Sequence, residues 1–194
     1  MRRAPLAALL LVLAASAAGA ERLADPTRAF VEGYDPSGND FLANVPERTV
    51  LLRVRADLDG DGREDLALSD SSTWGNAGGQ WLLFRSQADG AYAYWGTLFF
   101  APGAAALRVV APGVGELTTY VRTGGAKGTL QTHRLTAGGL GRRATAPLDL
   151  DVAGDRERYA AALAAGAPLP VEFCKLLDYR REPATCWHPG LGLR

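Results

Sequence analysis

The sequence predicts a mainly β protein, built as an antiparallel sheet or meander of consecutive strands, with one helix near the C-terminus. Three observations lead to this prediction. Short runs of alternating apolar and polar residues recur between residues 48 and 137, a pattern typical of half-buried strands. Turns rich in glycine and proline separate these runs, so that neighbouring strands are expected to pair in sequence. Only the stretch 156–165, late in the chain, has the composition of a longer helix.

The first 20 residues, MRRAPLAALLLVLAASAAGA, have the features of a secretory signal peptide. Two arginines precede the apolar run Leu6–Ala18, and small residues occupy positions 18–20, where a signal peptidase cleaves. A transmembrane anchor is the alternative, but it needs about 20 apolar residues, which exceeds this run. We therefore expect an exported protein, periplasmic or extracellular, that begins at Glu21 and has no integral membrane segment after cleavage.

The composition excludes some partners. The chain has 21 basic and 21 acidic residues and a formal net charge of 0, so no overall charge attracts it to nucleic acid or to an anionic membrane. Residues 21–194 are of a length that fits one mainly β domain. Lys127 and Lys175 are the only lysines among many arginines, a bias that points to a GC-rich, bacterial genome.

The expected elements begin with a short helix from Pro26 to Val31, which the turn-rich stretch GYDPSGND (33–40) ends. From Arg48 the pattern alternates, and this predicts a strand at 50–56 and another at 66–68. The hairpin-type turn QADG is expected to join the strand-like runs 79–86 and 91–100. The stretch RTGGAKGT (122–129) resembles a phosphate loop only faintly, because Lys127 precedes Gly128 and strands flank it, so we expect a hairpin turn there. Further strands are predicted at 79–86, 91–100, 106–111, 115–123 and 128–137, and GGLGRR (138–143) is expected to turn the chain again.

The C-terminal region, 148–194, is expected to contain a helix and a disulfide-pinned segment. Asp155 is the expected N-cap of the helix at 156–165, and Gly166 follows its end. Cys174 and Cys186 are the only cysteines, and in an exported chain such a pair indicates a disulfide. Two separate buried thiols are the alternative. A zinc site with His188 and His133 is not expected, because the spacing matches no usual finger.

The stretch DLDGDGREDL (57–66) brings together aspartates at alternating positions and two glycines. Calcium takes six to eight oxygen ligands, which a curled loop delivers from every second residue. Gly62 permits the sharp turn, and Leu68 stands where an EF-hand has its bidentate glutamate. A solvated acidic turn is the alternative, but four spaced acids exceed what a turn needs. The expected Ca²⁺ ligands are Asp57, Asp59, Asp61 and Asp65, with Arg63 offering its backbone carbonyl.

The stretch DLDGDGREDLAL resembles the calcium loop of FG-GAP repeats, the blades of integrin α-subunit propellers, and of the related bacterial VCBS-type repeats. The resemblance covers residues 48–100 and one copy of the repeat. It implies a strand–loop–strand hairpin that binds calcium, with a further hairpin downstream. It does not imply an adhesion role like that of integrins.

Few features point to catalysis. His133 falls within an alternating strand, and no G-x-S-x-G motif accompanies it, so we do not expect an enzyme. Trp81 alternates in phase with Leu83 and is expected in the core, whereas Trp74 lies in the loop SSTWGNAGG and is a candidate binding surface. We expect a calcium-binding module, its calcium structural, for a protein or glycan partner. The alternatives are a periplasmic inhibitor or immunity-type protein that blocks an enzyme, and a small hydrolase.

Overall fold

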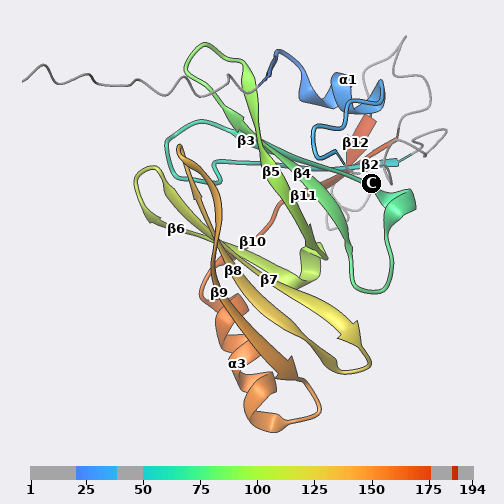
Figure 1. The fold of residues 1–194 in the computed structure, drawn as a ribbon, viewed down its shortest axis with the longest axis vertical. Coiled ribbons are helices and arrows are strands. Elements are labelled where there is room, and N and C mark those ends of the chain that lie inside the picture. Colours follow the sequence, from blue (N-terminus) through green and yellow to red (C-terminus); the bar gives the residue numbers. More distant parts are fainter. Residues whose placement is uncertain (1–20, 39–49, 176–184, 188–194) are drawn as a thin grey trace, which may run out of the picture.

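The computed structural model describes residues 21–38, 50–175 and 185–187. The predicted signal peptide, His188 and the residues 176–184 between the two cysteines lie outside this part of the chain. Within it, the polypeptide forms two antiparallel β-sheets and two α-helices, of which one is short (Figure 1). The predicted mainly β class is confirmed.

The first sheet has seven strands in the order β1-β5-β4-β3-β2-β11-β12. The four strands β2 to β5 pair in sequence, as the predicted meander requires, and β11 returns from the C-terminal region to pair with β2. The strands are β1 (Arg22–Leu23), β2 (Val50–Ala56), β3 (Asp65–Asp70), β4 (Gly79–Ser86), β5 (Tyr92–Phe100), β11 (Val171–Lys175) and β12 (Thr185–Trp187).

The second sheet has five strands in the order β10-β6-β7-β8-β9. A single turn of 3-10 helix, η2 (Pro102–Ala104), leads the chain from the first sheet into the second, and another, η1 (Ser71–Thr73), follows β3. The strands are β6 (Ala105–Ala111), β7 (Val114–Gly124), β8 (Lys127–Thr136), β9 (Gly139–Asp149) and β10 (Ala167–Pro168).

Strand β9 corrects the prediction that 138–143 only turns the chain. The turn ends by Gly139, and the next residues continue as an eleven-residue strand paired with β8. Most of its side chains are exposed, so its sequence lacks the apolar alternation by which the other strands were predicted. Pairing with β8, rather than burial of its own side chains, accounts for this strand.

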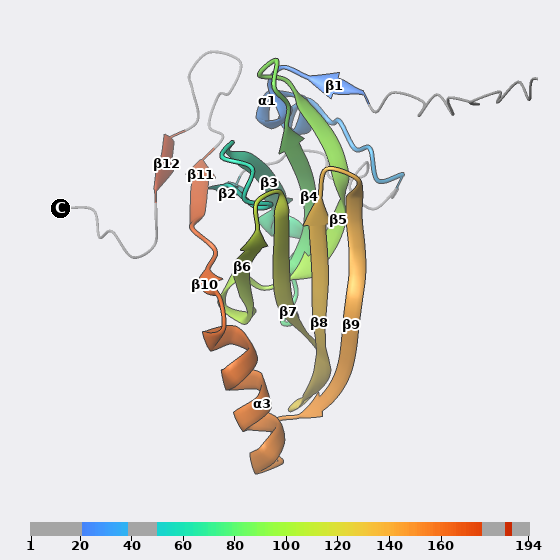
Figure 2. The same cartoon turned by 90° about the vertical axis from the view of Figure 1, so that its left-hand side faces the viewer.

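The helices lie on outer faces of the two sheets. Helix α1 (Pro26–Val31) forms where predicted, and Asp25 caps it by accepting a hydrogen bond from the Arg28 N–H at 3.0 Å. Helix α3 (Ala153–Ala164) runs beside the lower part of the second sheet (Figure 2). Its N-cap is Val152, so the predicted cap at Asp155 is wrong. Asp155 lies in the first turn, where its carboxylate accepts the Asp149 N–H at 2.8 Å.

Two apolar clusters hold these layers together. The larger lies between the two sheets and includes Trp81 and Leu83 from the first sheet and Leu117 and Leu135 from the second. Trp81 is fully buried, and its indole N–H donates to the Phe100 carbonyl at 3.1 Å. The prediction that Trp81 belongs to the core is confirmed. The smaller cluster lies on the opposite face of the first sheet, where Phe30 of α1 packs.

The predicted disulfide between Cys174 and Cys186 is present. The two cysteines are cross-strand partners in β11 and β12, so both ends of the closed loop lie in paired strands. Cys174 is fully buried and belongs to the smaller apolar cluster, on the outer face of the first sheet. None of the helices in the described ranges combines the length and apolar character that a membrane-spanning helix requires.

Candidate metal centre

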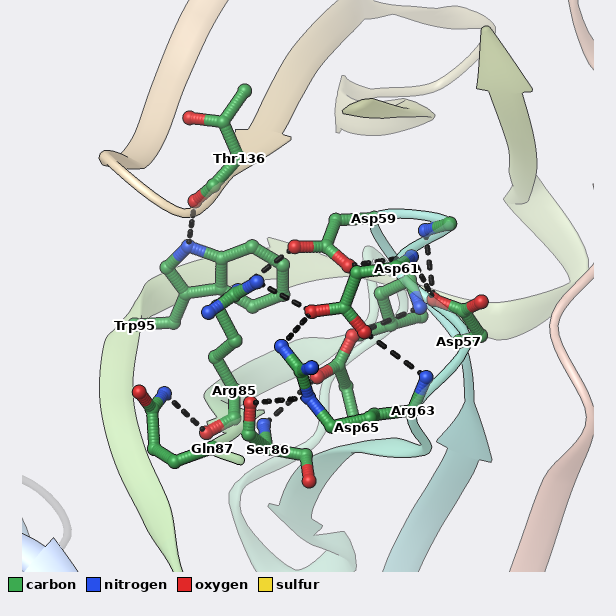
Figure 3. A network of polar contacts seen from close by, with 12 residues as sticks. Asp57, Asp59, Asp61, Arg63, Asp65, Arg85, Ser86, Gln87, Trp95 and Thr136 are labelled. Atoms are coloured by element: carbon green, nitrogen blue, oxygen red, sulfur yellow. Dashed lines mark hydrogen bonds and ion pairs between the residues drawn. The ribbon is translucent and has the colours of Figure 1, made fainter. Parts of the chain in front are cut away.

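The acidic loop connects the end of β2 to the start of β3, as the sequence pattern predicts. Gly60 and Gly62 have φ values of +75° and +86°, a left-handed conformation in which a β-carbon would be strained. These two glycines allow the tight turns of the loop, in which Asp57, Asp59 and Asp61 lie close together (Figure 3).

Asp57 organises the backbone of this loop. One of its carboxylate oxygens accepts the N–H groups of Gly60 at 2.7 Å and Asp61 at 3.0 Å. The other oxygen accepts the Gly62 N–H at 2.8 Å. Aspartate side chains commonly hold turns by bonding backbone groups a few residues on. The first aspartate therefore pre-forms the loop around its own side chain.

Three carboxylates converge in the loop. Asp57, Asp59 and Asp61 each offer an oxygen, and these oxygens lie within 4.8 Å of one another. Calcium binds oxygens at about 2.3–2.6 Å, so two of its ligands lie at most about 5 Å apart. Asp59 is fully buried, which makes a compensating positive charge necessary. The spacing of the three oxygens is compatible with a shared cation.

In this structure arginines supply the positive charge. Arg85 extends from β4 to the loop, where its Nε donates to Asp59 at 2.8 Å and its terminal nitrogen pairs with Asp61 (Figure 3). Only 14 % of the Arg85 side chain is exposed. Arg63 also pairs with Asp61, while its backbone N–H donates to the same carboxylate at 3.0 Å. Two of the three clustered carboxylates are thus compensated from within the chain.

Asp65 lies apart from the group of three. It is fully buried, and its two oxygens accept the backbone N–H groups of Leu58 at 3.0 Å and Ser86 at 2.9 Å. Burial raises the pKa of Asp65 to about 7, against the opposing effect of these two hydrogen bonds, and the charges of Asp59 and Asp61 raise it further. The structure therefore brings three of the four predicted carboxylates together, and the fourth, at the start of β3, joins the acidic loop to β4.

The loop also contacts the second sheet. Leu58 is buried in the cluster between the sheets, and the Gly60 carbonyl accepts the Gly113 N–H at 3.2 Å from the β6–β7 turn. A β-carbon at Gly115 would lie 1.8 Å from the Leu58 carbonyl oxygen, far inside van der Waals contact. The loop is consequently packed against the β6–β7 hairpin, and a change in its backbone would be felt in both sheets.

A second group of potential ligands, Glu172, Cys174 and Cys186, meets the same distance criterion. Both sulfurs are committed to the disulfide, and Glu172 forms an ion pair with Arg53 at 2.6 Å. A metal needs deprotonated thiolates, so these residues do not offer a second metal centre.

The structure changes the interpretation of Trp74 and adds Arg85 to the site. Trp74, predicted as a surface aromatic, is half-buried: its indole N–H donates to Ser69 at 2.7 Å, and its ring meets Trp81 edge to face. Arg85 was not predicted as a site residue. Residues 81, 83 and 85 alternate along β4, so Arg85 lies on the same face of the strand as the buried Trp81 and Leu83. Because charged residues are rarely buried unless they are paired, an arginine at such a position indicates a buried acidic partner.

Comparisons of this chain with protein families, with curated proteins and with solved structures found no match.

Proposed function

We propose that this protein is an exported β protein that binds calcium in the loop 57–65 and acts as a binding module, with calcium in a structural role. The observation that carries the proposal is the convergence of three carboxylate oxygens within 4.8 Å on a loop whose backbone is already turned around them. The resemblance of residues 48–100 to FG-GAP and VCBS-type repeats supports the same role.

The donor set favours calcium over softer metals. The clustered side chains of Asp57, Asp59 and Asp61 and the carbonyl of Arg63 are all oxygen donors, and neither cysteine nor histidine belongs to the loop. Hard oxygen ligands select calcium or magnesium rather than zinc or copper. Calcium tolerates the irregular geometry that a flexible loop provides better than magnesium does.

Arg85 has a defined part in this proposal. It neutralises Asp59 and Asp61 in the absence of calcium, so calcium and the guanidinium group compete for the same carboxylates. A calcium ion adds two positive charges where arginine supplies one. Arg85 accordingly keeps the loop folded at low calcium and weakens calcium binding relative to a loop without it.

Calcium binding would stabilise the whole fold, because the loop contacts both sheets through Leu58 and Gly60. At a calcium concentration of about 100 times Kd the stabilisation is about 2.7 kcal/mol. For a protein of this size this raises the melting temperature by roughly 5 to 10 °C. A scaffold of this kind is suited to an environment where calcium is plentiful, such as the cell exterior.

The test is thermal unfolding in chelator and in millimolar calcium. We expect the melting temperature of the wild-type protein to rise with calcium, and D57N and D61N to lose this rise because each removes one of the clustered charges. D151N, in an exposed turn after β9, is the matched control and should respond like the wild type. An unchanged melting temperature in the wild type would overturn the calcium site.

A second variant tests the competition. R85Q should melt at a lower temperature in chelator, because Asp59 is left buried without its ion pair. Its calcium-induced rise should be larger than that of the wild type. R156Q, an exposed arginine of α3, controls for the loss of one positive charge. A calcium-induced rise in R85Q no larger than in the wild type would show that the arginine and the metal do not compete.

Export is tested separately. The protein recovered from the periplasm or the medium of a bacterial host should begin at Glu21 when its N-terminus is sequenced. A product that retains Met1 and stays in the cytoplasm would contradict export without affecting the calcium test.

A further inference from the structure

A second candidate site lies where strand β5 meets the second sheet. A pocket of about 340 Å³ is bordered there by residues of β4 and β5 on one side and of β7, β8 and β9 on the other. None of its lining residues belongs to the calcium loop. The residues used below are Phe99 from β5, Val121 from β7, Gln131 and His133 from β8, and Arg142 from β9.

His133 is the buried polar group of this pocket. Only 4 % of the residue is exposed, and neither ring nitrogen makes a hydrogen bond to any residue in the described part of the chain. Burial lowers the pKa of His133 to about 4, with the nearby charge of Arg142 acting in the same direction. The imidazole is therefore neutral at pH 7 and presents one donor and one acceptor. Because the ring lines the pocket and its nitrogens are not bonded within the described part of the chain, they are available to a ligand.

A neighbouring hydroxyl is also without a partner. Thr119 is fully buried, and its Oγ1 has no hydrogen-bond partner among the described residues. It lies in β7 opposite Gln131, while His133 lies opposite Leu117 two positions away. Residues two apart in a strand face the same side of the sheet, so the threonine and the histidine belong to the same face. This face of β7 and β8 therefore carries an imidazole that lines the pocket and, beside it, a buried hydroxyl that has no hydrogen-bond partner in the described part of the chain.

The positive charge of Arg142 favours a ligand with a negative charge. It is the cross-strand partner of His133 in β9, it is exposed, and it forms no ion pair with any other described residue. Among the described residues that line the pocket, it is also the only one that carries a charge at pH 7. Arginine presents a planar set of donors that matches a carboxylate. The apolar part of the wall comes from Val121 and from Phe99, which is 43 % exposed.

We propose that this pocket binds the carboxylate end of a small ligand with an apolar side chain, either a free acid or the C-terminal residue of a peptide. Arg142 pairs with the carboxylate, His133 bonds the adjacent polar group of the ligand, and Phe99 and Val121 receive its side chain. The pocket combines convergent polar side chains with a smaller apolar part, and its volume lies at the lower end of the range of small-molecule sites.

The experiment titrates the full-length mature protein with N-acetyl-leucine and, as a matched neutral probe, with N-acetyl-leucinamide. We expect the acid to bind and the amide to bind at least about tenfold more weakly, since a charged hydrogen bond is lost. The imidazole C–H signals of His133 should shift in the NMR spectrum when the acid is added. Tripeptides ending in leucine, with a free or an amidated C-terminus, then separate a peptide end from a free acid.

Two variants test the assigned roles. R142Q should weaken binding of the acid at least about tenfold and leave the weak binding of the amide unchanged. R134Q, an exposed arginine of β8 on the opposite face, is the control and should bind like the wild type. Equal binding of acid and amide, no binding at about 10 mM, unshifted His133 signals, or an R142Q protein with unchanged affinity would each overturn the proposal.

Discussion

Asp59 is a fully buried carboxylate whose charge the protein offsets with an arginine from another strand. Its two oxygens accept the Asp61 N–H at 3.2 Å and the Arg85 Nε at 2.8 Å. Removing one partner of such a buried pair typically costs about 3–5 kcal/mol, because the remaining charge is left uncompensated. Without the Arg85 charge, the loop would need a bound cation to compensate Asp59.

His133 makes stability depend on pH. In the unfolded chain its pKa is 6.5, whereas burial and Arg142 lower the pKa to about 4 in the folded protein. Between these values the unfolded chain binds more protons, so folding is disfavoured as the pH falls from about 6.5 to about 4. We expect the wild type to lose up to about 3 kcal/mol of stability across this window through His133, and nothing above it.

The measurement compares denaturant unfolding of the wild type and H133L between pH 4 and pH 8 in chelator. The difference between the two proteins isolates His133, because the other titrating groups are common to both. The free energy of unfolding of the wild type minus that of H133L should be highest at pH 7 to 8 and should decrease as the pH falls to 4. A difference that stays constant over this range would mean that the imidazole titrates alike in both states.

At the scale of elements, the acidic loop and the β6–β7 hairpin are packed closely against each other. Gly115 of β7 faces the Leu58 carbonyl so closely that no β-carbon fits. The neighbouring hydrogen bond from Gly113 to Gly60 is 3.2 Å long. The hairpin and the loop therefore depend on each other's backbone, and the glycine in the strand is required for space rather than for an unusual φ angle.

Substituting this glycine should be costly. We expect G115A to lower the free energy of unfolding by about 2–3 kcal/mol, because a backbone atom must move to admit the methyl group. G141A is the matched control: Gly141 also lies in a strand of the second sheet, and nothing is within 4 Å of a β-carbon there. Its stability should change by less than about 1 kcal/mol. Equal effects in chemical denaturation would contradict the close contact at Gly115.

At the scale of the whole molecule, the two sheets share one apolar cluster. Leu117 and Leu135 of the second sheet pack in the same cluster as Trp81 and Leu83 of the first. The chain passes from the first sheet to the second through η2. It returns through β10, at the edge of the second sheet, to β11, which pairs with β2 in the first (Figure 2). Because the sheets bury each other's apolar faces, we expect them to unfold together.

This expectation is tested with L135A. Leu135 is fully buried, and truncating a buried leucine to alanine costs about 2–5 kcal/mol. Trp74, Trp81 and Trp95 lie in or beside the first sheet, and the Trp95 indole N–H also donates to the Thr136 carbonyl of the second. Their fluorescence therefore reports on the first sheet and its contact with the second, and far-ultraviolet circular dichroism on the strands of both. Both signals should shift to lower denaturant by the same amount. A shift in one signal without the other would show that the sheets unfold separately.

Much of this fold could be predicted from local patterns. Strand-like apolar runs bounded by turns predict β2, β4, β7 and β8 close to their observed limits, because each of these strands buries apolar side chains on at least one face. They do not predict β9, whose side chains are mostly exposed. The division into two sheets was also not predicted, since alternation shows that a strand has an inner face but not which sheet it joins.

The sequence by itself determined the loop, its glycine turns, its oxygen donors and the pairing of Cys174 with Cys186, because these depend on spacing between near neighbours. Tertiary structure alone decided that Arg85 meets Asp59, that Gly115 admits the Leu58 carbonyl, and that His133 and Arg142 border one pocket. Each of these contacts joins residues on separate elements, either a strand and the acidic loop or two strands. Their meeting depends on strand register and on how the sheets pack, which no local pattern encodes.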